Sequence, residues 1–247
     1  MQYGSTCSES DFENNFKSKF FSVCPQTLKN RDCLVSCLLY AVHGLLIVGF
    51  EDIFPVWAAT YDSLNGLDFL PSHIGLLYFI VVPILIPLQI VMIPKVANHL
   101  SAKTIVISTS FLCIIGIPLV PCTERLKNKY LLWLVLILLM IFIRFLFTAQ
   151  CTSICIFINN SVDEDQLSSA NGLGMAMSAV GRASAPLIFG SIYSWSMTNV
   201  KHLNPDGLGF PFNQYVTFYL LCCICLMIAI PAAFFPDRLN KPRNSYV

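Results

Sequence analysis

The 247-residue sequence has little charge: Asp, Glu, Lys and Arg together make up 12% of it, and the formal net charge at pH 7 is +1. A typical soluble domain carries charge on about a quarter of its residues. Without a basic surface, the chain is not expected to bind nucleic acid. Apolar residues make up 55% of the sequence, which places the chain among integral membrane proteins.

The sequence also lacks the motifs of common enzyme and metal sites. It contains no phosphate-binding glycine loop, no nucleophile elbow and no cluster of metal-ligating residues. We therefore expect no enzymatic activity, no catalytic residue, no cofactor and no metal site. Eleven cysteines are present, but most fall in apolar segments, where a thiol behaves as a small hydrophobic group. No disulfide framework is expected from them.

The apolar residues are concentrated in six long blocks. Residues 1–32 precede the blocks; they are polar and of mixed charge, and we expect a flexible cytoplasmic tail there. Each block is long enough for a helix that crosses about 30 Å of hydrocarbon. The blocks are 33–60, 73–94, 104–121, 130–158, 168–194 and 213–235. The predicted fold is an all-α integral membrane bundle of six transmembrane helices over residues 33–236, followed by a short basic tail at 237–247.

The distribution of basic residues between the blocks predicts the orientation of this multi-pass chain. Six spans place both termini on one side, where nine Lys and Arg residues lie, against four on the opposite side. Basic residues accumulate on the cytoplasmic side of membrane proteins, so both termini are expected to be cytoplasmic. The plasma membrane and an internal vacuolar or lysosomal membrane both remain open as the location.

Two adjacent carboxylates, Glu51 and Asp52, interrupt the first apolar block. A carboxylate at the centre of a membrane helix costs about 2.5–3.5 kcal/mol on insertion scales, so it usually faces a bundle interior or a water-filled path. Adjacent helix positions point about 100° apart, so the two acids should have different neighbours. We interpret them as proton-coupling residues. The alternative is a membrane boundary, because Trp57 and Tyr61 fit an interfacial aromatic belt.

Two arginines lie inside apolar blocks. Arg144 follows fourteen residues of predicted helix, so its charge is expected to have a partner, either a carboxylate of the first helix or an anionic substrate. A side chain that extends to the membrane surface is the alternative for Arg144. Arg182 lies in the middle of the fifth block among small residues, and a role in packing, gating or substrate contact is expected for it.

Several uncharged polar residues are candidates for the lining of a substrate path. Gln150 and Asn171 are the main ones, with hydrogen bonding between helices as the alternative for both. His43 lies two helical turns before Glu51 and either bonds to a neighbouring helix or belongs to a proton relay.

The fifth block is rich in Gly, Ala and Ser, which allow a neighbouring helix to approach closely. Proline and glycine positions in the first and fifth blocks are candidates for helix bending or gating. These positions are Pro55, Gly181, Pro186 and Gly190.

Two stretches resemble a known transporter family. Residues 50–57, FEDIFPVW, are similar to an acidic-pair, Ile-Phe-Pro-Leu-Trp-type sequence in the seventh helix of zinc-induced-facilitator-like and tetracycline-resistance-like proton antiporters. Residues 159–173, with Pro186, Gly190 and Trp195 beyond them, resemble the tenth-to-eleventh helix region of the same group. This group belongs to the major facilitator superfamily, and the matches cover most of residues 45–235.

The resemblance implies the carboxy-terminal six-helix half of a twelve-helix transporter whose substrate path lies between two halves. It implies secondary active, proton-coupled transport of a small organic or drug-like solute, with antiport as the expected mode. The implied partners are the lipid bilayer, the small-molecule substrate, protons, and a second six-helix unit from a homodimer or a separate amino-terminal half. Because the loop at 94–103 lacks the Gly, Asp and Arg of the family's cytoplasmic motif, the alternative is a truncated, non-transporting protein that binds or modulates a full-length relative.

Overall fold

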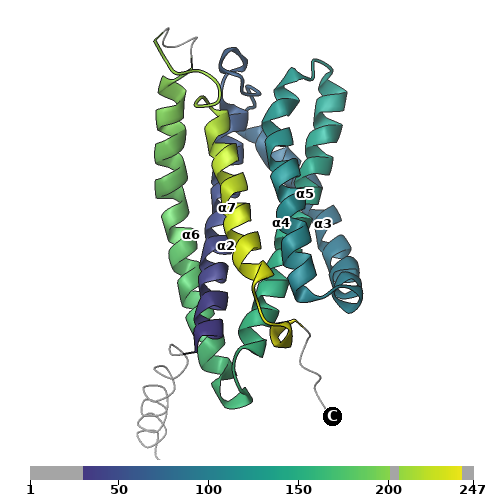
Figure 1. Ribbon diagram of the computed structural model, residues 1–247. Coiled ribbons are helices and arrows are strands. Elements are labelled where there is room, and N and C mark those ends of the chain that lie inside the picture. Colours follow the sequence, from purple (N-terminus) through teal and green to yellow (C-terminus); the bar gives the residue numbers. More distant parts are fainter. Residues whose placement is uncertain (1–29, 201–205, 241–247) are drawn as a thin grey trace, which may run out of the picture.

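The computed structural model describes residues 30–200 and 206–240. Over these residues it contains six long α-helices, four short 3-10 turns and no β-strand, and the helices alternate in direction along the bundle (Figure 1). The helices are α2 (Arg31–Ala59), α3 (Pro71–His99), α4 (Ala102–Cys122), α5 (Lys129–Asn160), α6 (Leu167–Thr198) and α7 (Tyr215–Ala233). Each predicted block corresponds to one helix, which confirms the all-α membrane bundle. Of the tail predicted for residues 1–32, residues 1–29 lie outside the described residues. The prediction is wrong for its end, because Asn30 caps α2 and the helix begins at Arg31.

Five of these helices are long and apolar enough to cross a membrane. They are α2, α3, α4 with its 3-10 extension, α5 and α7. The remaining helix, α6, has 32 residues, as many as α5, but it carries more small and polar side chains. This composition is typical of a helix that packs closely against another helix rather than one surrounded by lipid.

Local sequence signals define where several helices begin. Asn30, Ser101 and Asn128 precede α2, α4 and α5, and the side chain of each accepts hydrogen bonds from backbone N–H groups in the first turn. These bonds satisfy donors that have no partner within the helix itself. Pro71 begins α3, a position where the missing proline N–H costs no hydrogen bond.

Helix α2 is central to the bundle. It packs most extensively against α6 and also contacts α5 and α7, while α4 lies between α5 and α7 and α3 packs on α5 (Figure 1). The six largest fully buried side chains of the described residues are aromatic and come from α2, α5, α6 and α7. They are Phe50, Phe54, Trp57, Phe157, Phe189 and Phe218.

Helix α3 is the least enclosed of the apolar helices. Its buried residues, Leu77, Val81 and Leu85, recur every four positions and therefore form a single stripe. The other faces of α3 carry exposed large apolar side chains, which suits contact with lipid or with another helical unit.

The first and last described segments of the chain meet at one end of the bundle. The lower end in Figure 1 holds the start of α2, the loop after α5 and a 3-10 turn at Asp237–Leu239. Leu239 is fully buried there, and Asn240 accepts a hydrogen bond from the backbone N–H of Lys103. Residues 237–240 of the predicted basic tail thus pack against the helices, and residues 241–247 lie outside the described part of the chain.

Candidate functional site

The centre of the candidate site is an ion pair between α2 and α5. Nη2 of Arg144 lies 3.1 Å from Oε1 of Glu51, and the two side chains are 20% and 40% exposed, respectively. Arg144 lies at the middle of α5, and Glu51 lies eight residues before the end of α2, about 12 Å along the helix axis. Both charges therefore fall at a depth that a bilayer would cover. A carboxylate of α2 is one of the alternatives that the sequence leaves open for Arg144, and the structure places Glu51 there. The charge-balancing role of Arg144 stays a prediction.

Arg144 also contacts a third helix. Its guanidinium carbon lies 4.9 Å from the ring centroid of Tyr78 on α3, which is a cation–π distance. The Nε of Arg144 is buried and has no hydrogen-bond partner among the described residues. Arg144 thus joins α2, α3 and α5 while part of its hydrogen-bonding capacity remains unused.

A pocket of about 610 Å³ lies beside this ion pair, between α2 and α6. It is lined by Glu51, Asp52, Ile53, Pro55, Val56, Pro186, Gly190, Tyr193 and Ser194. Both acids border this pocket, but their contacts differ, as their spacing on the helix predicts. Glu51 pairs with Arg144, whereas Oδ2 of Asp52 is buried and has no hydrogen-bond partner among the described residues.

Below the ion pair, a buried polar network joins α2, α4 and α5. Nδ1 of His43 lies 2.9 Å from Oε1 of Gln150, and Nε2 of Gln150 donates to Oγ of Ser110 at 2.7 Å. All three side chains are fully buried. Gln150 therefore lies between helices and away from the pocket, which corresponds to the interhelical alternative for this residue.

Two other candidate residues lie away from the pocket lining. Arg182 is exposed on α6, and its Cγ is directed toward Gly44 of α2. Asn171 donates hydrogen bonds to Oδ1 of Asn159 at 2.8 Å and to the carbonyl of Leu167 at 3.1 Å. Both positions belong to contacts near the lower half of α6, and a role for either in a substrate path stays a prediction.

The candidate bending residues separate into two groups. Pro55, Pro186 and Gly190 all line the pocket. Gly181 instead lies where α6 passes α2, because a Cβ added there would be 2.0 Å from the carbonyl oxygen of Ala41. Glycine at this position permits a backbone-to-backbone contact that no larger residue would allow. Bending or gating at these four positions stays a prediction.

Sequence reasoning missed three side chains that the structure brings to the site or its supports. They are Tyr78, Ser110 and Tyr193. The hydroxyl of Tyr193 lies 2.8 Å from the hydroxyl of Thr60. A polar atom within an apolar block was the available signal for each of them. Which neighbour each atom meets depends on helix packing, which the sequence alone does not give.

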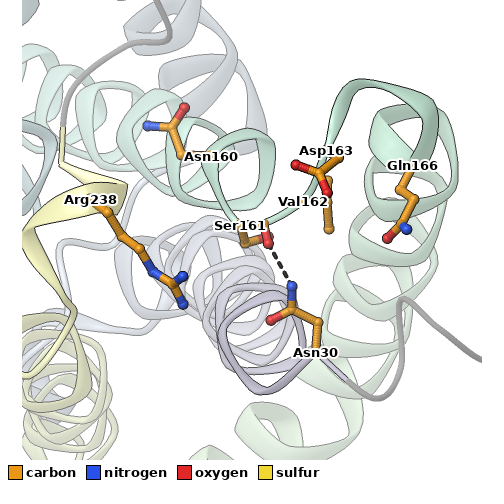
Figure 2. Close-up of a pocket in the computed structure, with 7 residues that line it drawn as sticks. All are labelled: Asn30, Asn160, Ser161, Val162, Asp163, Gln166 and Arg238. Carbon is orange, nitrogen blue, oxygen red and sulfur yellow. Dashed lines mark hydrogen bonds between the residues drawn. The ribbon is translucent and has the colours of Figure 1, made fainter.

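A second, polar pocket of about 340 Å³ lies at the lower end of the bundle (Figure 2). Asn30 donates a 2.6 Å hydrogen bond to the carbonyl of Ser161 and thereby ties the start of α2 to the loop after α5. Arg238 lines the same pocket and forms an ion pair with Asp32. These contacts join helix ends, and the acidic pair in α2 lies far from them along the helix.

Comparison with known proteins finds similarity to two plant transport proteins. The chain is 26% identical over 174 residues to a probable peptide/nitrate transporter of Arabidopsis thaliana, an alignment that covers 70% of this chain and 35% of the relative. It is 25% identical over 212 residues to ZINC INDUCED FACILITATOR 1 of Arabidopsis thaliana, with 82% of this chain and 40% of the relative covered. Both relatives are members of the major facilitator superfamily.

The alignments span well under half the length of either relative. No family profile matches the chain, and no solved structure matches it. The similarity is therefore to one part of each relative, and both relatives are transport proteins rather than enzymes.

Proposed function

We propose that this chain forms one six-helix half of a major facilitator transporter that moves a small organic solute by secondary active transport. Proton coupling would depend on Glu51 and Asp52, with Arg144 as the balancing charge. The observation that carries the proposal is the Glu51–Arg144 ion pair, which lies at membrane depth beside a pocket large enough for a small molecule. The similarity to two plant transport proteins supports the same reading.

The proposed coupling follows from the charges at the ion pair. When Glu51 is ionised, its charge and that of Arg144 cancel, and the contact holds α2 against α5. When Glu51 binds a proton, Arg144 loses its counter-charge and keeps only its contact with the ring of Tyr78 on α3. An unpaired charge inside a membrane is costly, so protonation favours an arrangement in which Arg144 finds another partner.

The proposed solute path uses the pocket between α2 and α6. The pocket is bordered by Pro55, Pro186 and Gly190. A change of bend at these positions in α2 or α6 would therefore change the shape of the pocket. A second six-helix unit, supplied by a second copy or by a separate chain, would close the path from the opposite side and rock against this half.

Reconstituted vesicles test the coupling. The protein is placed in liposomes that contain a pH-sensitive dye, a pH gradient is imposed, and organic cations, anions and neutral solutes are added one at a time. We expect the wild-type protein to dissipate the gradient only with a transported solute. The double variant Glu51→Gln/Asp52→Asn should slow this dissipation by at least tenfold because neither residue can carry the proton.

Asp62→Asn serves as the matched control, because it removes an exposed carboxylate just after α2 without touching the pocket. It should retain the wild-type rate. If the double variant coupled solute and proton movement as fast as the wild type, the proposed role of the two acids would be wrong.

A further inference from the structure

The two acids that border the pocket between α2 and α6 differ in whether a neighbouring charge balances them. The charge of Glu51 is cancelled by Arg144 at 3.1 Å. Asp52 borders the same pocket, and its buried Oδ2 has no hydrogen-bond partner among the described residues. Arg182, on the facing helix α6, directs its Cγ toward Gly44, two helical turns below Asp52. The pocket therefore holds one carboxylate charge that the described residues do not balance.

The remaining lining of the pocket is mostly apolar. Ile53, Pro55, Val56 and Pro186 provide hydrocarbon surface, and Tyr193 has its hydroxyl hydrogen-bonded to Thr60. A volume of about 610 Å³ lies within the range of about 300–1,000 Å³ usual for small-molecule sites. A ligand that fits this lining has an apolar body and a single positive charge.

A bare metal ion fits the pocket less well than an organic cation does. Metal ions in proteins need several oxygen, nitrogen or sulfur ligands around them. Within residues 30–200 and 206–240, no group of three or more His, Cys, Asp and Glu side chains converges in a way that could hold a metal. One carboxylate surrounded by hydrocarbon suits a diffuse organic charge, because such an ion gives up little hydration on entering.

We infer that Asp52 is the counter-charge for a monovalent organic cation with an apolar body, bound in the pocket between α2 and α6. This inference rests on the proposed function, since it takes this pocket to be the solute site. The two acids then have different roles: Glu51 forms the ion pair with Arg144, and Asp52 binds the ligand.

Equilibrium binding tests the inference without any gradient. The full chain in lipid nanodiscs is dialysed against radiolabelled tetraphenylphosphonium, an apolar monovalent cation, and against tetraphenylborate, an anion of the same shape, with protein-free nanodiscs as background. We expect saturable binding of the cation only. Asp52→Asn should weaken this binding by at least tenfold, Asp52→Glu should retain most of it, and Asp62→Asn should leave it unchanged. Equal binding of the two ions, or full binding to Asp52→Asn, would overturn the inference.

A steric pair of variants provides a test that leaves every charge in place. Gly190 lines the pocket and Gly172 lies on the same helix away from it, and a Cβ added at either position meets no atom within 4 Å. Gly190→Leu should fill the pocket and weaken binding of tetraphenylphosphonium by at least tenfold, whereas Gly172→Leu should not. Equal affinities in these two variants would place the cation outside this pocket and refute the assignment.

Failure of this inference and failure of the proposed function can be told apart. If tetraphenylphosphonium binds through Asp52 but no solute moves with protons in vesicles, the binding site stands and the transport proposal fails. If proton-coupled transport depends on Glu51 while Asp52→Asn binds the cation normally, transport stands and the cation site is wrong.

Discussion

Helix α2 meets its neighbours α6 and α5 in two different ways. Against α6 the packing is close: a Cβ added at Gly49 would lie 2.1 Å from the Phe189 ring, and one added at Gly181 would lie 2.0 Å from the backbone carbonyl oxygen of Ala41. Against α5 the contact is polar, through the Glu51–Arg144 ion pair and the His43–Gln150 hydrogen bond. Close backbone contact fixes a distance, whereas polar pairs can exchange partners when a proton arrives. The α2–α6 contact at Gly181 and Ala41 is thus suited to rigidity and the α2–α5 contact to change.

The largest expected effect comes from breaking the close contact. Gly181→Ala places a methyl group 2.0 Å from the carbonyl oxygen of Ala41, so the two backbones must separate. We expect the free energy of unfolding to fall by about 3 kcal/mol, the upper end of the usual range for overpacking, because backbone cannot rotate away as a side chain can. Unfolding of the purified protein by titration with sodium dodecyl sulfate in mixed micelles measures the change.

Gly172→Ala is the matched control in the same helix, because its added methyl group meets no atom within 4 Å. This variant should be as stable as the wild type or slightly more stable, since alanine favours a helix over glycine by about 0.5–1 kcal/mol. Equal stability of the two variants would mean that α2 and α6 are not in backbone contact.

The sequence predicts the number and span of the helices well, because about 20 apolar residues in a row have few alternatives to a membrane helix. It also predicts a partner for Arg144, since an isolated charge at the middle of α5 would be costly. Helix pairing is harder to predict. Lipid and protein interior are equally apolar, so hydropathy does not reveal which face of a helix meets another helix.

Gln150 illustrates this limit. The sequence allows it to line a path or to bond to a neighbouring helix, and the structure places it between His43 and Ser110. Tyr78 illustrates the same limit, because the apolar residues around it in the sequence give no sign that Arg144 lies over its ring. Both contacts join residues more than 35 positions apart, so they depend on tertiary packing.

A smaller effect is expected from removing the buried polar contact of α2 with α5. Gln150→Leu removes two fully buried hydrogen bonds, those to His43 and Ser110. Ser110 keeps its hydrogen bond to the carbonyl of Val106, whereas His43 loses its side-chain partner. Single interhelical hydrogen bonds in membrane proteins contribute about 0.6 kcal/mol on average, so losing two should cost about 1–2 kcal/mol. The same titration with sodium dodecyl sulfate measures the loss.

Gln89→Leu provides the comparison for this variant, because it removes one half-buried hydrogen bond, from Gln89 to Thr148, between α3 and α5. Its cost should be about 0.6 kcal/mol. A Gln150→Leu variant no less stable than Gln89→Leu would contradict the view that the buried network helps to hold α2 against α5.

The smallest effect is expected at the third polar contact of α2, the ion pair between Asp32 and Arg238 at the lower end of the bundle. The Arg238 side chain is 71% exposed, so water screens the attraction, and the coupling energy from a double-mutant cycle of Asp32→Asn and Arg238→Gln should be about 0–1 kcal/mol. It should also shrink further in 1 M salt, where the Debye length is about 3 Å. A coupling energy well above 1 kcal/mol that persisted in salt would mean that this end of α2 is shielded from water. The polar contacts of α2 would then differ in strength because of their chemistry and not because of their depth in the bundle.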